Sequence, residues 1–329
     1  MSDVPHPRGP PPCQDPDCSN EAHFRNEYVY CLEHDHPFVA PSLVEDETSG
    51  ISNGSFTFYF GASCGSSRKT LRQLEEPNVC LSYATKNNKP WDSIDGLMVD
   101  SGGYGLIKRG DGEYPDSVDD YLEYVETHQP TWYMTRDVPA SDRIFNKLGG
   151  GVSEAIARTI EYTKETIEAS RDYDIDGEPV AVLQGTTPRE YVQCYHELVR
   201  EDLVTGRLAI GSLKMHTSIE VAQIISAVAD VVEPETELHG LGVDVPDLKY
   251  ESVRENLDSA DSSRYIATAR WRGNRGETPP RLREDEPKQG WFETARAYLD
   301  MREDLREVLD RQPSAVETES DSPIQKTLA

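Results

Sequence analysis

The chain has 329 residues, enough for one large hydrophobic core with a small appendage. Asp and Glu number 60 against 33 Lys and Arg, which gives a formal net charge of -27. No apolar run reaches the roughly 20 residues of a membrane span, and the proline-rich start lacks the apolar stretch of a secretory signal. We therefore expect a cytoplasmic protein with no membrane partner.

The acidic excess is spread along the whole chain and is not collected in one tail. A negative field repels nucleic acid at ordinary ionic strength, whereas molar salt shortens the Debye length to about 3 Å. We interpret the acidity as adaptation of a halophile to a high-salt cytoplasm. It removes the usual basic-patch argument for a nucleic-acid partner without excluding such a partner.

Residues 1–12 are rich in proline and are predicted to be disordered, and residues 13–54 to form a zinc-binding segment and a linker. Four residues separate Cys13 from Cys18, and two separate Cys31 from His34. Two such close pairs predict a structural, tetrahedral Zn²⁺ site of the zinc-knuckle kind, with His23 as a competing ligand. The alternative is that these are unpaired residues of a polar loop.

Between residues 55 and 310, short apolar runs alternate with helical patterns. The predicted strands are Phe56–Phe60, Leu97–Val99, Thr131–Met134, Val180–Leu183, Leu208–Ile210 and Leu238–Val243. Short apolar runs of this kind are typical of buried parallel strands. Six to eight strand–helix units favour an α/β fold of the (β/α)8 TIM-barrel class over an open doubly wound sheet.

Three helices are predicted from periodicity and caps. One starts near Ser153, one opens with a capping box at Thr187–Glu190 that has Pro188 in its first turn, and one follows Ser218. A further helix over residues 290–310 could close the ring of the barrel, and residues 311–329 are predicted to be a disordered acidic tail.

Polar residues and glycines follow several of the predicted strands. Asp100 ends one strand and precedes Ser101, Gly102, Gly103 and Tyr104. Later strands are followed by Asp137, by Gln184 and Gly185, and by Gly211, and the segment after Leu257 carries Asp258, Asp261 and Arg264. Because the chemistry of a barrel lies at the C-terminal ends of its strands, these residues predict a site there.

These residue types suit recognition of a purine-like base. A carboxylate can accept from the N–H edge of guanine, a Gln amide can both donate and accept, and an aromatic ring can stack on the base. Two further carboxylates can divide nucleophilic and acid–base work at an anomeric carbon. Taken singly, each Asp is better explained as a helix cap or turn residue, so the prediction depends on their occurrence at successive strand ends.

Four segments resemble, in the same order, motifs of the tRNA-guanine transglycosylase family. Asp-Ser-Gly-Gly-Tyr at 100–104 resembles the family's Asp-Ser-Gly-Gly-Phe, and Val-Leu-Gln-Gly at 182–185 resembles its Val-Gln-Gly strand end. Leu-Ala-Ile-Gly at 208–211 resembles its Leu-Ala-Val-Gly strand, and residues 258–264 resemble the segment with the nucleophilic aspartate. The resemblance covers about residues 56–275 and implies a barrel enzyme, a pentosyltransferase, that exchanges bases in nucleic acid.

The resemblance also implies roles for single residues. Asp261 would attack the sugar C1′ to form a covalent intermediate, and Asp100 would act as general acid and base. Asp258 stays open as a rival nucleophile. The implied substrate-binding set is Ser101, Gly102, Gly103, Tyr104, Asp137, Gln184, Gly185, Gly211 and Arg264.

Several features depart from the tRNA-modifying members. Those members carry three cysteines and a histidine after the nucleophile, whereas no cysteine follows Cys194 here. Gly105 stands where the family has Gln after its aromatic residue. In these features the chain is more similar to the branch of the family that inserts 7-deazaguanine bases into DNA, the deoxypurine-in-DNA protein A type. An enzyme of that branch would flip a guanine out of the DNA duplex.

The favoured hypothesis is therefore exchange of guanine in DNA for a free 7-deazaguanine base, with accessory DNA-modification proteins as candidate partners. The alternatives are the same chemistry on tRNA, of the archaeosine or queuosine type, and a non-catalytic nucleic-acid-binding barrel. Arg270, Arg272 and Arg275 could hold phosphates beside the nucleophile, or they could form a solvated basic turn.

Overall fold

The computed structural model describes residues 51–53, 56–86, 89–91, 94–110, 113–274 and 291–310, together with three short strands nearer the N-terminus. These strands are β1 (His23–Arg25), β2 (Tyr28–Tyr30) and β3 (Pro37–Val39), and they form a small antiparallel sheet. The predicted zinc ligands Cys13, Cys18, Cys31 and His34 lie outside the described residues, as do residues 1–12 and 311–329. The zinc site therefore stays a prediction.

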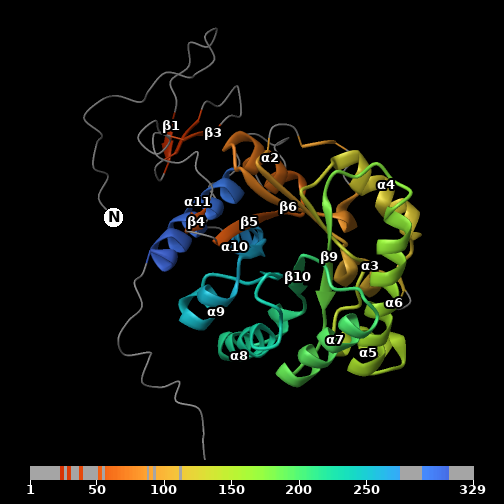
Figure 1. Ribbon diagram of the computed structural model, residues 1–329. Helices are drawn as coiled ribbons and strands as arrows, with labels where there is room; N and C mark the ends of the chain where they lie inside the picture. The colour runs from red at the N-terminus through yellow and green to blue at the C-terminus, as the bar shows by residue number, and fades with distance from the viewer. Residues whose placement is uncertain are drawn as a thin grey trace, which may run out of the picture.

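The main body is a closed barrel of parallel strands with helices around it (Figure 1). Its strands in the described chain are β5 (Phe56–Ala62), β6 (Asn78–Ser82), β7 (Gly96–Asp100), β8 (Trp132–Met134), β9 (Glu178–Leu183), β10 (Arg207–Ile210), β11 (Glu237–Gly240) and β12 (Ser259–Ser262). Neighbouring strands pair in chain order, and β12 pairs with β5 to close the ring. The predicted (β/α)8 barrel is confirmed.

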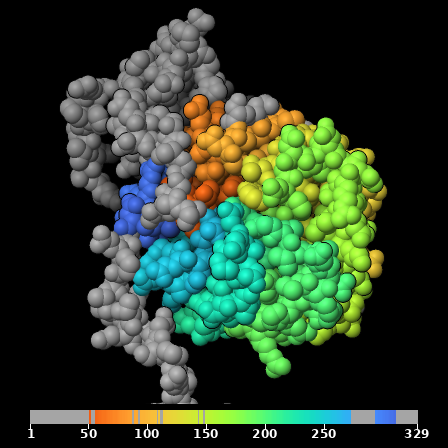
Figure 2. Space-filling model, viewed as in Figure 1, coloured from red at the N-terminus to blue at the C-terminus, as the bar shows by residue number. Residues whose placement is uncertain are grey.

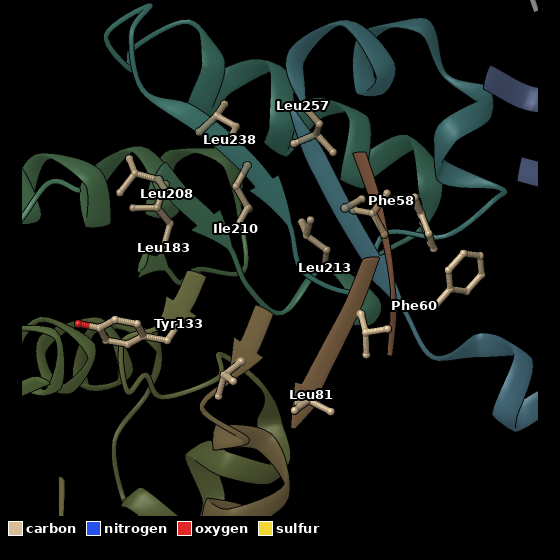
Figure 3. Packing of buried hydrophobic residues seen from close by; sticks show 14 of the residues in the cluster. Phe58, Phe60, Leu81, Tyr133, Leu183, Leu208, Ile210, Leu213, Leu238 and Leu257 are labelled. Atoms are coloured by element: carbon tan, nitrogen blue, oxygen red, sulfur yellow. The ribbon is translucent and has the colours of Figure 1, made fainter. Parts of the chain in front are cut away.

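The period-two alternation of a strand decides which side chains fill the barrel and which face the helices. The interior cluster consists of Tyr59, Cys80, Met98, Met134, Val180, Val182 and Ala209. Residues one position away, such as Leu81, Leu183 and Leu238, belong instead to the shell packed between strands and helices (Figure 3). Burial on both faces explains why most strands are short continuous apolar runs.

The described helices are α2 (Gly65–Gln73), α3 (Gly103–Arg109), α4 (Val118–His128), α5 (Asp142–Leu148), α6 (Val152–Ser170), α7 (Pro188–Arg200), α8 (Ser218–Ala229), α9 (Glu251–Asn256), α10 (Arg264–Asn274) and α11 (Trp291–Leu309). Three short 3-10 turns, η1 (Tyr83–Thr85), η2 (Leu213–Met215) and η3 (Asp247–Lys249), lie between them. None of the helices in this part of the chain has the length and apolar character needed to cross a membrane.

The start of α7 differs from the predicted capping box. Thr187 is the N-cap and its side chain accepts from the backbone N–H of Glu190, with Pro188 in the first turn as expected. The Glu190 carboxylate, however, accepts from the backbone N–H of Thr186 at 2.9 Å, one residue before the N-cap. The reciprocal contact is thus displaced by one residue, and the orphan donors of the first turn are still satisfied.

Helix α11 lies beside both α10 and α2, so the last described helix meets the first described helix of the barrel. Figure 2 shows the blue surface of α11 next to the blue-cyan surface of the preceding helices. Glu76, which lies between α2 and β6, accepts from Tyr298 Oη at 2.5 Å and from Arg302 Nη1 at 2.8 Å. All three side chains are buried. A buried charge is stable only when it is paired and hydrogen-bonded, so this triad fixes α11 against the barrel.

Candidate active site

The predicted site residues lie at the C-terminal ends of the barrel strands. Asp100 ends β7, Gln184 follows β9 directly, and Gly211 follows β10 directly. Asp137 lies three residues after β8, and Asp261 is the third residue of β12. In parallel strands these ends meet at one mouth, which is where barrel enzymes carry their chemistry.

The turn from β7 into α3 depends on two glycines. Gly102 has a φ of 74°, and a Cβ at this position would lie 2.6 Å from the backbone nitrogen of Ala84. Its N–H donates to Asp100 Oδ1 at 3.1 Å. A Cβ on Gly103 would lie 2.6 Å from the Tyr114 hydroxyl. The glycine pair therefore holds the Asp100 carboxylate and lets α3 approach the neighbouring loop closely.

Asp137 is the centre of a buried hydrogen-bond network. Its Oδ1 accepts from Ser101 Oγ at 2.8 Å and its Oδ2 accepts from Gln184 Nε2 at 2.7 Å. Tyr114 holds the backbone of Asp137 by two hydrogen bonds: its hydroxyl donates to the Asp137 carbonyl at 2.9 Å and accepts from the Asp137 backbone N–H at 3.1 Å. Burial, reinforced by the nearby charge of Asp100, raises the pKa of Asp137 to about 7.

The amide of Gln184 is held in one orientation. Its Oε1 accepts from Ser212 Oγ at 2.7 Å and from the Ala140 backbone N–H at 3.2 Å, so its Nε2 faces Asp137. Gly211 leaves room for this amide, since a Cβ there would lie 2.3 Å from Gln184 Nε2. The amide has a second N–H that the contact with Asp137 does not use.

Asp261 is held from two sides at the end of β12. Its Oδ1 accepts from the backbone N–H of Gly242 at 2.8 Å and lies 3.5 Å from His239 Nε2. Burial acts to raise the pKa of Asp261, but the contact with His239 and the charge of Lys214 outweigh it, and the pKa is lowered. The carboxylate is therefore ionised at neutral pH.

Asp100 responds in the opposite direction. Burial raises its pKa, and the charge of Asp261 raises it further, against hydrogen bonds from Gly102 and Ser82. The two carboxylates are 161 positions apart in the sequence, yet they are close enough in the fold to interact electrostatically. A pair of acids whose pKa values are pushed apart is a typical arrangement for divided acid and nucleophile roles.

Asp258 lies at the other end of the barrel. It precedes the first residue of β12, and its Oδ2 accepts from the backbone N–H of Leu238, near the start of β11, at 2.8 Å. Its own carbonyl accepts from Thr57 at the start of β5. This position separates Asp258 from the strand ends that carry Asp100 and Asp261.

Three other predicted substrate residues lie near the mouth without joining the network. Tyr104 is half-buried in the first turn of α3. Arg264 starts α10, and its Nη1 lies 3.3 Å from Asp244 Oδ2. Gly185 packs against α7, since a Cβ there would lie 2.8 Å from the Tyr191 nitrogen.

Of the arginines expected near the nucleophile, Arg272 of α10 pairs with Asp300 of α11 at 2.7 Å, and Arg275 lies outside the described residues. Among the described residues no group of three His, Cys, Asp or Glu side chains could hold a metal ion.

Sequence reasoning assigned no role to four residues of this region: Tyr114, Ser212, Lys214 and His239. Tyr114 and Ser212 lie in loops, where no periodicity marks them, and their role follows only from contacts between distant segments. His239 carried a usable signal. It alternates with Leu238 and Gly240 in a predicted parallel strand, and the neighbouring Leu238 faces the helices, so a polar side chain at 239 must point into the barrel.

No model of a known protein family matches this chain, and no curated protein matches it at a significant level. The relation to transglycosylases therefore stays a prediction from four short motifs, and the geometry of the site is the independent information about function.

Proposed function

We propose that this protein is a transglycosylase that exchanges guanine in nucleic acid, DNA in preference to tRNA, for a free 7-deazaguanine base. The proposal is carried by one observation: two carboxylates from distant parts of the chain lie at the barrel mouth, Asp100 at the end of β7, held by the N–H of Gly102, and Asp261 in β12, held by the N–H of Gly242. Their surroundings raise the pKa of Asp100 and lower that of Asp261. This is the division that a general acid and a nucleophile need at an anomeric carbon.

In the proposed first step, the Asp261 carboxylate attacks C1′ of the target nucleotide while the bond from C1′ to N9 of guanine breaks. The electron pair of that bond stays with the base, and Asp100 donates its proton to the departing base. In the second step Asp100 takes a proton from the incoming base, whose nitrogen attacks C1′ and releases Asp261. Atoms and charge balance, and no external reductant or metal is required.

The Asp137–Gln184 pair provides base recognition in this proposal. Ionised Asp137 would accept from N1–H and N2–H of guanine, and the unused N–H of Gln184 would donate to O6. Both side chains are almost fully buried, at 6% and 1% exposure, so a base lacking these groups would leave them unpaired. We expect strong discrimination against adenine.

The direct experiment incubates the protein with labelled guanine and either duplex DNA or tRNA, in molar salt. Label in DNA supports the proposal, and label in tRNA alone assigns the same chemistry to the other substrate. Absence of exchange with both, from a protein shown to be folded, overturns the proposal and favours a non-catalytic nucleic-acid-binding barrel.

A matched pair of variants tests the nucleophile. Asp261→Asn should abolish any covalent adduct between protein and nucleic acid, because an amide cannot attack C1′. Asp258→Asn, at the opposite end of the same strand, should leave the adduct intact, because an amide oxygen can still accept from Leu238. An adduct that persists in Asp261→Asn and is lost in Asp258→Asn would contradict the assignment.

The N-terminal zinc site is a separate proposal that comes from the sequence alone. We expect one structural Zn²⁺ per chain, bound by Cys13, Cys18, Cys31 and His34. Elemental analysis of the purified protein, compared with a variant that carries Ser at Cys13 and Cys18, tests it: equal zinc content in both would refute it.

A further inference from the structure

A chain of polar side chains runs through the barrel interior to Asp261. Arg207, at the start of β10, donates through Nε to Glu237 at 2.9 Å and through Nη1 to Ser259 Oγ at 3.2 Å. Ser259 Oγ lies 2.9 Å from His239 Nδ1, and His239 Nε2 lies 3.5 Å from Asp261 Oδ1. The register of the sheet places these residues side by side, with Arg207 opposite Glu237 and His239 opposite Ser259.

The donors and acceptors of this chain fix the tautomer of His239. A guanidinium can only donate, so Ser259 Oγ accepts from Arg207. The serine oxygen has a second lone pair, but its own buried proton needs an acceptor, and in the described part of the molecule His239 Nδ1 is the hydrogen-bond partner that can accept it, so we assign the hydroxyl proton to Nδ1. The ring proton of neutral His239 is therefore on Nε2, the nitrogen that faces Asp261.

His239 is also neutral when it does this. Burial lowers its pKa and the charge of Arg207 lowers it further, against the raising effect of Asp261. Its ring is fully buried at 0% exposure and packs edge-on against Tyr59 at 6.1 Å between centroids. Its Nε2 makes no hydrogen bond within the described residues, and Asp261 Oδ1 lies 3.5 Å away, close enough for an electrostatic contact.

Core packing alone does not account for this arrangement. The neighbouring interior cluster is apolar, and a buried polar chain of this length is often no more stable than well-packed apolar residues of the same volume. Unlike apolar residues, this series of polar side chains presents one fixed N–H, that of His239 Nε2, to one carboxylate oxygen. This N–H and the Gly242 N–H both face Oδ1 of Asp261, and among the described residues no hydrogen bond engages its second oxygen.

We propose that His239 is a positioning residue whose Nε2–H, fixed by Ser259 and Arg207, turns the Asp261 carboxylate so that its free oxygen faces the sugar carbon. This inference rests on the proposed function for its catalytic meaning. The positioning itself is a property of the folded protein and can be measured without any substrate.

Several other charged or titratable groups face His239 and Asp261, and a measurement must separate their effect on the pKa of Asp261 from that of His239. Asp261 interacts with Lys214 of η2, Asp100 of β7 and Cys80 of β6, and His239 interacts with Arg207 of β10. A change at His239 leaves Lys214, Asp100 and Cys80 in place. An altered titration of Asp261 in such a variant therefore reports the contact with His239.

The experiment follows the Asp carboxyl carbons of the full-length protein by ¹³C NMR, with the Asp261 signal assigned by its loss in Asp261→Asn. We expect the pKa of Asp261 to rise in His239→Phe, which has no donor, and to stay near the wild-type value in His239→Gln, whose amide nitrogen can replace Nε2. Ser259→Ala, which keeps the histidine and frees its tautomer, should give an intermediate rise. His128→Phe, at another buried histidine outside the barrel, is the control.

Activity provides the second readout where exchange is observed. In His239→Phe we expect kcat to fall about tenfold to a hundredfold with KM nearly unchanged, because a misdirected nucleophile affects the chemical step. His239→Gln should recover most of the rate. An unchanged Asp261 titration in folded His239→Phe overturns the inference, and if that variant does not fold, an unchanged titration in Ser259→Ala does so. A shifted titration in a protein without exchange activity would instead reject the proposed function and keep the positioning contact.

Discussion

Replacing Asp137 by Asn tests whether the site stores an electrostatic strain. Asp137 ionises near 3.8 when unfolded and near pH 7 in the fold, chiefly because of burial. The folded state therefore binds the proton more tightly, and the stability of the wild-type protein falls as the pH rises through this interval. Asn carries no titrating proton and escapes this loss.

The size of the effect follows from the two pKa values. At about 1.36 kcal/mol for each pKa unit, holding Asp137 ionised above pH 7 costs up to ~4 kcal/mol. About half of this, ~2 kcal/mol, develops between pH 5.5 and pH 8, an interval that stays above the sequence pI of 4.6. We expect the stability of Asp137→Asn relative to wild type to increase by that amount across the interval.

The Asn side chain fits the existing network. Its oxygen can accept from Gln184 Nε2, and its amide can donate to Ser101 Oγ, whose own proton can turn to the Tyr114 hydroxyl at 3.2 Å. Altered hydrogen bonds can change the free energy of unfolding of Asp137→Asn by an amount that is the same at every pH. The pH-dependent part of the difference is therefore the quantity that tests the argument.

The assay is urea unfolding of wild type and Asp137→Asn at pH 5.5 and pH 8 in the same molar salt. Asp304→Asn on α11 is the control, because Asp304 is exposed and its variant should follow the wild type at both pH values. A stability difference between Asp137→Asn and wild type that does not change with pH would refute the reasoning. Under the proposed function this more stable variant should also lose guanine exchange.

Other predictions concern single contacts. Lys214→Ala should raise the pKa of Asp261, since that charge lowers it, and the acid limb of the exchange pH profile should move to higher pH. Gly102→Ala should lower the free energy of unfolding by about 1–3 kcal/mol or more, because φ is 74° and the new methyl would meet Ala84; urea unfolding measures it. Glu76→Gln should lower the free energy of unfolding by about 3–5 kcal/mol, because it removes the buried carboxylate that pairs with Arg302 of α11, and limited proteolysis should then release α11 first.

The barrel could be predicted because most of its strands are apolar on both faces. Two strands were missed. β12 has the sequence Ser-Ala-Asp-Ser, whose interior positions are the polar residues Ser259 and Asp261, so no apolar run marks it. β6 carries the apolar run Val79–Leu81, which is as long as the predicted strand Leu97–Val99, so its pattern was present in the sequence and was overlooked.

The strand-end acids could be located from sequence, but their protonation could not. Asp100 and Asp137 are the same residue type at or shortly after the ends of apolar strands, and Asp261 is a third Asp, within the polar strand β12. Only the fold places Asp261 beside Gly242 and His239 and buries Asp137 behind Ser101 and Gln184. Protonation depends on neighbours from other strands, which a sequence pattern does not specify.

The three acids form a graded series around one mouth, and the grading explains why the protein tolerates so much negative charge there. Asp261 has the N–H of Gly242, the contact with His239 and the charge of Lys214 to hold its anion. Burial raises the pKa of Asp137 to about 7 and also raises the pKa of Asp100 above its usual value. A site with three full anions would repel an approaching phosphate backbone, whereas here the anion of Asp261 is stabilised and the other two carboxyl groups hold their protons more tightly than exposed ones. Under the proposed function, that difference between the acids is what would suit the barrel mouth to displacing and accepting a base.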